Sequence, residues 1–354
     1  MRVTILGLSI TSAWGNGHAT NYRALARALH RRGDQVTFLE RDMPWYAQHR
    51  DLPSSPWCST HLYDSLAELR QSFAPAVAEA DLVIVGSFVP DGVAVASWVL
   101  GTAAGAVAFY DIDTPVTIGK LRGGDAEYLS AELVERFDLY LSFTAGPALE
   151  ILADEFGARR PEAFYCFVDA EAYAPVEAPE RWAINYLGTY SEGRQPAVEE
   201  LLCKPARLRP DLRFSVAGPM YPAGIEWPPN VERTSHLPPH EHPAFYCGAR
   251  FTLNLTRPEM RALGYSPSVR LFEAGACGAA IISDWWPGLE TVFTPGEEIV
   301  IARHSRDVLE IVEETTPEEA AAIGAAARRR VLDEHTADRR VERLHELVAG
   351  VPAR

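Results

Sequence analysis

The sequence is short of positive charge, and of lysine in particular. Lysine occurs at Lys120 and Lys204, and every other basic residue is an arginine. Altogether 33 basic residues face 48 acidic ones, which gives a net charge of −15. A surface of this sign repels the phosphates of nucleic acids and the headgroups of anionic membranes. We therefore expect neither nucleic acid nor a membrane surface among the partners.

Cysteine is also scarce. The chain has five cysteines, with no CxxC pair and no spacing typical of a metal site. An odd number of separated cysteines in a long chain is typical of reduced thiols. The first residues read as an apolar strand and not as the basic start of a signal peptide. We expect a cytoplasmic protein with no resident metal and no cofactor.

One stretch, residues 93–110, has 18 residues without a charge, which is the minimum length of a candidate membrane helix. Gly101 and Gly105 interrupt it, and polar residues are scattered through it. The pattern therefore predicts a buried helix followed by a buried strand, without membrane insertion.

A chain of 354 residues predicts two domains, at about 100–200 residues each. In the first half, a strand at 2–6, a loop at 7–17, a helix at 19–32 and a strand at 35–39 form a βαβ unit. Further strands are expected at 82–85, 107–110, 139–143 and 163–173. A linker with two prolines follows at 174–179.

The alternating pattern restarts after this linker. Strands are expected at 184–187, 213–217, 251–255 and 280–283, with a clear helix at 268–276. Thr316 and Glu319 form a capping box that opens a helix reaching about residue 334. The prediction is an α/β fold of two doubly wound Rossmann-type domains, 1–173 and 180–335, facing a central cleft. Residues 336–354 are expected to form a last helix that packs back on the first domain.

A glycine loop precedes the first helix, and it consists of Gly15, Asn16 and Gly17. Glycines let a backbone approach a ligand closely, and a helix N-terminus attracts anions. A dinucleotide fingerprint would need a third glycine where Thr20 stands, and Glu40 is not a decisive acidic partner. Two interpretations stay open: a tight turn with His18 capping the helix, or a loop that meets the sugar or acceptor, with His18 as proton acceptor.

Asp111 and Asp113 come directly after the strand at 107–110. Ligands bind at such strand ends in open α/β sheets. The two carboxylates could hold a metal bound to a diphosphate, or accept hydrogen bonds from sugar hydroxyls. A purely structural alternative is a turn capped by Asp113.

The most specific segment is 264–278, which runs from a loop into a helix. Ser268 suits the N-cap, so the amides of Ser268, Val269 and Arg270 are donors aimed at an anion. Glu273 lies about one turn further in, where it can bind both hydroxyls of a ribose. Together these positions predict a nucleoside diphosphate, although an amphipathic core helix explains part of the pattern.

In these residues the chain resembles the CgeB-type glycosyltransferases, relatives of the family 4 retaining glycosyltransferases with a GT-B fold. The resemblance covers most of the chain in separate blocks: 7–18, 110–117, 187–196, 217–222 and 266–298. It implies a GT-B-like fold and transfer of a sugar from a nucleotide sugar.

The resemblance also implies roles for single residues. Glu273 matches the second glutamate of the family's E-x7-E motif, which binds the donor ribose, whereas Tyr265 stands in place of the first. Arg194 matches a basic residue that contacts the diphosphate, and Arg257 is a second candidate. Relatives carry a histidine near the transferred sugar, and here Asp111 or Asp113 takes its place.

Arginines suit a diphosphate because a guanidinium pairs with phosphate oxygens in bidentate geometry. We expect Arg194, Arg257 and Arg270 to cluster and to neutralise the leaving group without a metal. The base is expected at the loop 217–222, which contains Gly218, and at 236–239, which contains Leu237. Trp285 and Trp286 follow a strand and could pack either on the cleft or in the core, and we favour the core.

The residues and the resemblance together predict a glycosyltransferase that uses a nucleoside-diphosphate sugar. The resemblance alone implies that it is retaining and metal-independent. The acceptor stays open among a small natural product, a polysaccharide and a protein. Two alternatives also stay open: an epimerase that converts the nucleotide sugar without an acceptor, and a non-catalytic protein that binds it.

Overall fold

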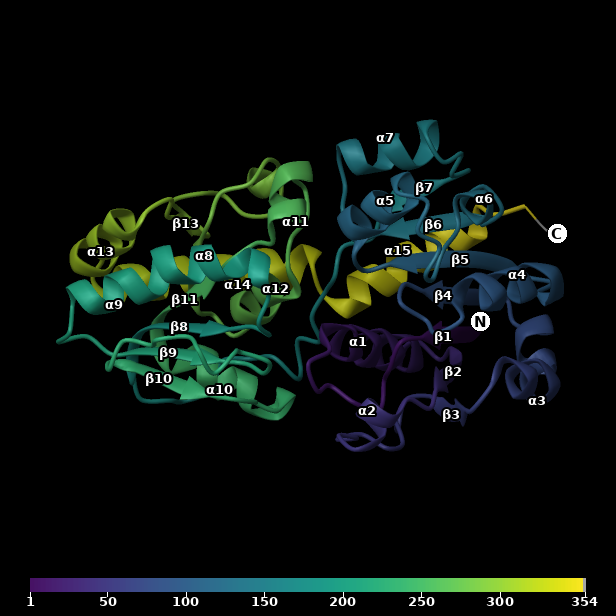
Figure 1. Ribbon diagram of the computed structural model, residues 1–354, viewed down its shortest axis with the longest axis horizontal. Coiled ribbons are helices and arrows are strands. Elements are labelled where there is room, and N and C mark those ends of the chain that lie inside the picture. Colours follow the sequence, from purple (N-terminus) through teal and green to yellow (C-terminus); the bar gives the residue numbers. More distant parts are fainter. Residues whose placement is uncertain (353–354) are drawn as a thin grey trace. The chain divides into compact units, whose positions relative to one another are not determined.

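The computed structural model describes residues 1–352, and these divide into two compact units (Figure 1). Unit 1 contains residues 1–166 and the chain from Ala337 onward, and unit 2 contains Phe167–Thr336. Each unit is built around one parallel sheet with helices on its faces. Strands buried on both faces need apolar residues throughout, which is why short apolar runs marked them in the sequence.

Unit 1 has a seven-stranded sheet in the order β3-β2-β1-β4-β5-β6-β7. Its strands are β1 (Arg2–Gly7), β2 (Gln35–Arg41), β3 (Ser59–Tyr63), β4 (Leu82–Gly86), β5 (Ala106–Asp111), β6 (Leu139–Ser142) and β7 (Pro161–Ala163). Its helices are α1 (Gly17–Arg31), α2 (Pro44–Ala47), α3 (Leu66–Ala78), α4 (Gly92–Thr102), α5 (Thr114–Arg122), α6 (Ala131–Val134), α7 (Pro147–Asp154) and α15 (Ala337–Ala349).

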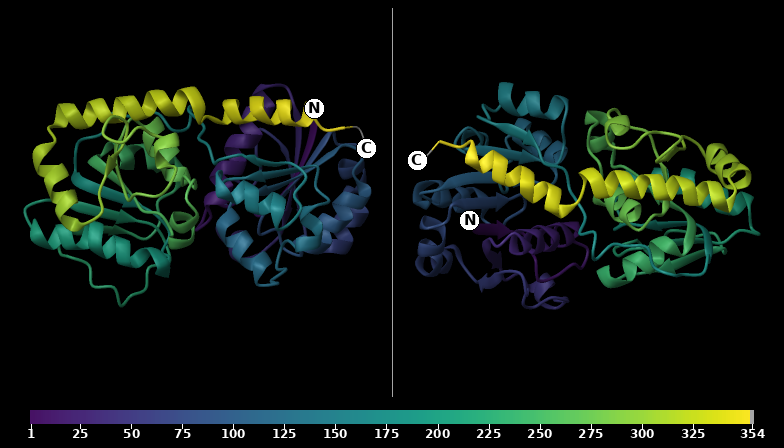
Figure 2. Two further views of the ribbon diagram at one scale, coloured as in Figure 1. Left: turned by 90° about the horizontal axis from the view of Figure 1, so that it is seen from above. Right: turned by 180° about the vertical axis from the view of Figure 1, so that it is seen from behind.

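The last helix, α15, packs against α1 within unit 1 (yellow in Figure 2). The Arg31 guanidinium forms an ion pair with Asp338 at 2.8 Å, and the His345 ring contacts the Asp34 carboxylate at 2.8 Å. Buried apolar side chains of α15, such as Leu344, complete this contact.

The uncharged stretch 93–110 contains the helix α4 and the buried strand β5, separated by a short turn. The predicted helix followed by a strand is therefore confirmed. Within residues 1–352, no helix combines the length and the apolar character that crossing a membrane requires.

Unit 2 has a six-stranded parallel sheet in the order β10-β9-β8-β11-β12-β13. Its strands are β8 (Trp182–Leu187), β9 (Phe214–Ala217), β10 (Val231–Thr234), β11 (Ala249–Asn254), β12 (Ala280–Ser283) and β13 (Val300–Ile301). Its helices are α8 (Gln195–Val198), a π-helical turn (Glu199–Cys203), α9 (Lys204–Leu208), α10 (His242–Cys247), α11 (Pro258–Leu263), α12 (Val269–Ala276), α13 (Ser305–Glu314) and α14 (Pro317–Glu334), with 3₁₀ turns at Glu192–Arg194, Pro239–Glu241 and Leu289–Thr291.

The strand order of unit 2 reverses between β8 and β11, which is the place where open α/β sheets bind ligands. Helices α12 and α14 pack on each other beside β12. Helix α14 begins with the predicted capping box, in which Thr316 and Glu319 bond each other's backbone amides.

The expected strand at 163–173 is wrong. Strand β7 ends at Ala163, and the amides of Ala172 and Tyr173 bond the carbonyl of Asp169 in a turn. Val168 forms an isolated bridge with Thr336 and so joins unit 2, which is why the division falls at 166/167. The strands β3, β10 and β13 were not foreseen.

Candidate functional site

The candidate site of unit 2 begins at Arg194, in the 3₁₀ turn that follows β8. One guanidinium nitrogen, Nη2, donates to the carbonyl of Thr189 at 2.6 Å, whereas the buried Nε has no hydrogen-bond partner among the described residues. Burial lowers the pKa of Arg194, and the charges of Arg270 and Arg257 lower it further. The three predicted arginines are therefore brought together.

Arg270 is buried at the start of α12, where its bonds tie two strand ends together. Its Nε donates to the carbonyl of Leu187 at the end of β8, and its Nη1 donates to Asn254 Oδ1 at the end of β11, at 2.9 Å. The guanidinium lies 4.8 Å from the centroid of the Tyr186 ring. No carboxylate in residues 1–352 forms an ion pair with Arg270 or with Arg194. Unit 2 thus concentrates positive charge where its sheet reverses.

Ser268 occupies the N-cap position of α12, but its side chain does not cap the helix. Its hydroxyl donates to Asn254 Oδ1 at 2.7 Å instead. The first amides of a helix have no intrahelical acceptor, so those of Val269 and Arg270 keep their capacity to bind an anion. The predicted cap is correct in position and wrong in its hydrogen bond.

Glu273 lies one turn into α12 and is only 5% exposed. The Tyr246 hydroxyl donates to its Oε2 at 3.0 Å. Burial raises the pKa of the Glu273 carboxyl to about 7, while the hydroxyls of Tyr246 and Tyr173 and the charge of Arg270 act in the opposite sense. The carboxyl is therefore poised between its two protonation states near neutral pH.

A second layer of polar groups lies beside Glu273. The Tyr173 hydroxyl contacts His242 Nδ1 at 3.0 Å, and His242 Nε2 contacts the carbonyl of Leu237 at 3.2 Å. Burial lowers the pKa of His242 to about 4, so its ring is neutral at pH 7. The predicted base loop at Leu237 is thus linked through His242 to Tyr173, and His242 Nδ1 lies 4.0 Å from Glu273 Oε2.

Gly218 sits at the end of β9 with a φ of +141°, and a Cβ there would lie 2.1 Å from the carbonyl oxygen of Gly188. Only glycine allows this approach of the two strand ends. The loop beyond is fixed by Arg233, whose guanidinium lies 4.2 Å from the Tyr221 ring and 4.6 Å from the Trp227 ring. A preformed loop therefore follows Gly218.

The two neighbouring tryptophans differ. Trp286 is fully buried, as expected, whereas Trp285 is 45% exposed. The core prediction is therefore wrong for Trp285, because the chain turns after β12 and carries this ring to the surface.

In unit 1 the structure separates the two candidate aspartates. Asp111 is fully buried and accepts hydrogen bonds from the Tyr140 and Thr117 hydroxyls at 2.7 and 2.8 Å. Its internal bonds and its burial make it a structural residue, which corrects its assignment as catalytic. Asp113 is partly exposed at the N-cap position of α5, and its side chain does not cap that helix.

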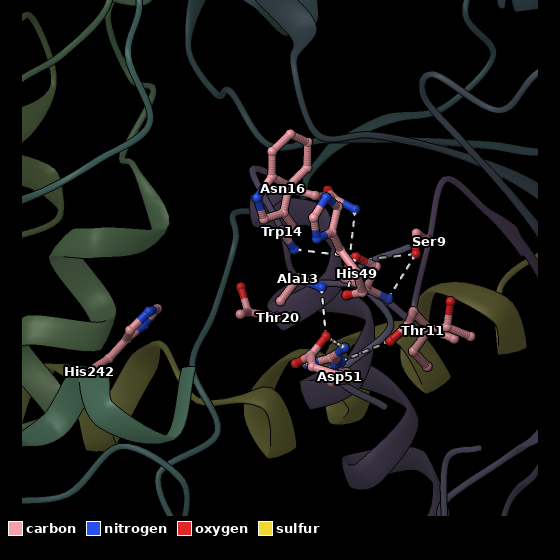
Figure 3. A network of polar contacts seen from close by, with 12 residues as sticks. Ser9, Thr11, Ala13, Trp14, Asn16, Thr20, His49, Asp51 and His242 are labelled. Carbon is pink, nitrogen blue, oxygen red and sulfur yellow. Dashed lines mark hydrogen bonds and ion pairs between the residues drawn. The ribbon is translucent and has the colours of Figure 1, made fainter. Parts of the chain in front are cut away.

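The glycine loop of unit 1 is held by hydrogen bonds within the unit (Figure 3). Asn16, and not His18, caps α1, because its side chain accepts from the His18 amide at 2.9 Å. Gly15 has a φ of +60°, which explains this glycine. The Ala13 amide donates to Asp51 at 2.9 Å. His18 is half-buried, and its ring packs edge-on against Phe88.

Sequence reasoning missed the tyrosines and the histidine that surround Glu273. Tyr173 lies in a segment expected to be a strand, and Tyr246 and His242 lie in a short helix without a motif. No sequence pattern marks these three residues as polar neighbours of Glu273. They meet only in the folded structure.

Residues 194–346 match a family described as glycosyl transferase-like. No curated protein matches the chain. Among solved structures, sucrose-phosphate synthase from Thermosynechococcus elongatus is similar over 98% of each chain, with a TM-score of 0.69 and 15% identity.

Two further structures cover 99% of both chains. HepE from Anabaena, in complex with UDP and glucose, has a TM-score of 0.70 and 14% identity. An alpha-glucosyltransferase, in complex with UDP-glucose and DNA containing an abasic site, has a TM-score of 0.73 and 14% identity. The fold is therefore GT-B, with two Rossmann-like units, as expected. Together with the matched segment, it supports an enzyme of the glycosyltransferase class.

Proposed function

We propose that this protein transfers a sugar from a UDP-sugar to an acceptor, and that unit 2 binds the donor. The observation that carries the proposal is the cluster of Arg194, Arg257 and Arg270 at the reversal point of the sheet. Neither Arg194 nor Arg270 has a carboxylate partner among the described residues, so their charge is available to an anion.

A diphosphate suits this place. Arg194 can turn its unbonded Nε toward a phosphate oxygen, and the first amides of α12 can receive a second oxygen. The negative charge that develops on the departing nucleotide is stabilised by the same groups, which lowers the barrier to transfer. Arg270 holds the strand ends in place while it contributes its charge.

The nucleoside is expected on the side of Glu273. Its carboxylate can accept hydrogen bonds from both ribose hydroxyls, while Tyr246 fixes its orientation. The base is placed at the loop after Gly218 and beside Leu237, where backbone groups can read its edge.

Uridine is the proposed nucleoside because HepE and the alpha-glucosyltransferase were solved with UDP or UDP-glucose. We further propose that no metal and no cofactor are needed, since the arginines supply the positive charge. Retention of the anomeric configuration and membership of the CgeB-type group stay predictions from the sequence.

The acceptor stays open. The alpha-glucosyltransferase was solved with DNA, but the net charge of −15 here favours an acceptor other than nucleic acid. Asp113 and His18 of unit 1 stay candidates for contact with the reacting sugar.

The test is release of UDP from a panel of UDP-sugars, with and without a pool of candidate acceptors and with and without EDTA. The proposal expects acceptor-dependent release of UDP that EDTA leaves unchanged and that Arg194→Ala abolishes. Conversion of the UDP-sugar without any acceptor would indicate an epimerase. Tight binding without release under all conditions would indicate a non-catalytic protein.

A further inference from the structure

A cavity of about 540 Å³ lies at the carboxyl end of the sheet of unit 2. The residues proposed to bind the diphosphate are not part of its lining. Loops after β8, β11, β12 and β13 surround it. Its walls include Gly193, Ala197, Thr256, Arg261, Asp284 and Trp285. A volume of this size is within the range of about 300–1,000 Å³ that is typical of small-molecule sites.

The cavity adjoins the arginine cluster. Gly193 directly precedes Arg194, and Pro258 directly follows Arg257, and both line the cavity. The two residues touch, because a Cβ on Gly193 would lie 3.1 Å from Pro258 Cδ. A diphosphate held by the arginines therefore has this cavity immediately beside it.

The chemistry of the walls suits a sugar ring. The half-exposed ring of Trp285 offers a flat apolar face to the C–H groups of a pyranose. Polar groups of the lining are Asp284, which accepts from the Thr256 hydroxyl at 2.8 Å, and Arg261, which lies 4.0 Å from Asp284. An aromatic face with hydrogen-bonding groups fixes both the plane and the hydroxyls of a sugar.

The charged side chains that line the cavity indicate which class of sugar it would bind. Two carboxylates, of Asp284 and Glu200, are matched by two guanidinium groups, of Arg261 and Arg303. The Glu200 carboxylate is already bonded to the Ser305 amide at 2.9 Å. A balanced lining neither requires nor repels a charged ligand strongly, so it favours an uncharged hexose over a uronic acid.

We propose that this cavity binds the transferred sugar of the donor, an uncharged hexosyl group, and that Trp285 and Arg261 determine the preference for it. This proposal rests on the proposed function, because it assumes a UDP-sugar on the arginine cluster. It adds the subsite that distinguishes the UDP-sugar from UDP.

The experiment compares dissociation constants measured by calorimetry for UDP, UDP-glucose, UDP-galactose, UDP-N-acetylglucosamine and UDP-glucuronic acid. The wild type is expected to bind one uncharged UDP-sugar about tenfold more tightly than UDP, and more tightly than UDP-glucuronic acid. Trp285→Ala and Arg261→Ala should each reduce that preference to about twofold, with the UDP constant unchanged within about twofold.

Ala197 also lines the cavity, so Ala197→Leu reduces its volume and should remove the same preference without changing Trp285 or Arg261. Trp45→Ala and Arg306→Ala, at side chains 50% and 85% exposed outside the cavity, are the controls. A preference that survives Trp285→Ala and Ala197→Leu, or a wild type that binds UDP and all four sugars equally, overturns the subsite. Failure of the wild type to bind UDP at all overturns the proposed function as well.

Discussion

The loops that follow the first strand of each sheet differ in how their polar groups are satisfied. In unit 1 the buried Glu40 carboxylate accepts four hydrogen bonds from the loop, from the Ser9 hydroxyl, the Ile10 amide, and the amide and hydroxyl of Thr11. In unit 2 the loop after β8 carries Arg194, and among residues 1–352 its Nε has no hydrogen-bond partner and its guanidinium forms no ion pair with a carboxylate.

This difference indicates that the loop of unit 1 is structural and that the loop of unit 2 is a binding site. A buried charge with its full set of hydrogen bonds stabilises the fold and has nothing left for a ligand. A buried charge with an unfilled donor costs stability unless a ligand provides the acceptor. Two loops at equivalent places in two Rossmann-like units therefore have different roles: the first stabilises the fold, and the second is available to bind a ligand.

The largest effect is expected from Glu40→Gln, which tests the structural half of the comparison. The new NH₂ group replaces one of the two oxygens, each of which accepts two bonds, so about two accepted bonds are lost in a buried place. We expect the free energy of unfolding to fall by about 3 kcal/mol in chemical denaturation, with UDP affinity of the folded variant unchanged. Glu79→Ala, at an exposed carboxylate, is the control. A loss of UDP affinity without a loss of stability would reverse the comparison.

Arg194→Ala tests the binding half. Removal of a charged donor from the diphosphate should weaken UDP by about 2–3 kcal/mol, or roughly 30- to 150-fold, in calorimetry. Stability should be unchanged or slightly higher, because a buried and unbalanced cation is removed. Arg306→Ala, at an exposed arginine paired with Glu310, should change neither quantity. Strong destabilisation by Arg194→Ala would mean that this loop is structural too.

Glu273→Gln tests the binding site of unit 2 through the pH dependence of the free energy of unfolding. The pKa of Glu273 is about 7 in the native state against an ordinary 4.5, so the native state binds more protons than the unfolded state between these values. The contribution of Glu273 to stability is therefore lost as pH rises through 7. The variant lacks this titration, and it should gain about 2 kcal/mol relative to the wild type between pH 5 and pH 8.

Denaturation curves at several pH values measure this difference. Asp111 and Asp284, whose pKa values are also raised to about 6 by burial, titrate in both proteins and cancel in the comparison. A constant difference between Glu273→Gln and the wild type across this range would show that Glu273 does not titrate there.

The smallest effect is expected from Tyr246→Phe. The lost hydroxyl stabilises the charged form of Glu273, so its removal raises the carboxyl pKa further and moves the pH profile of UDP-glucose binding upward. At pH 7 we expect about threefold weaker binding, with recovery at pH 8.5. UDP-glucose is the probe because both of its phosphates are esterified and do not titrate in this range. Tyr63→Phe is the control, because the Tyr63 hydroxyl is buried in unit 1 and has no hydrogen-bond partner among residues 1–352. An unchanged profile would separate Tyr246 from the ionisation of Glu273.

Most of the fold could be predicted from the sequence because the central strands are short apolar runs with turns on both sides. The strand β10 is half-buried at a sheet edge, and β13 has two residues, so neither has an apolar run to recognise. The segment 163–173 is apolar enough for a strand, but the chain leaves the edge of the sheet after Phe164, and the buried rings of Phe164 and Phe167 account for its apolar character.

Glu273 could be selected from the sequence because it stands beside small residues, and Arg194 because it matches a basic position of the resembled family; their roles stay predictions. The burial of Asp111 and the exposure of Trp285 could not be predicted. Each depends on the direction that the chain takes after a strand, which the sequence pattern does not show. The tyrosines around Glu273 come from separate segments, and their meeting depends on tertiary packing alone.

The central claim is that the loop after β8 recognises a diphosphate. The most direct measurement is a calorimetric comparison of UDP with uridine on the wild-type protein in the presence of a chelator. We expect UDP to bind at least about 100-fold more tightly than uridine, because the arginine cluster and the amides of α12 contact only the phosphates. Equal affinity for UDP and uridine would contradict it.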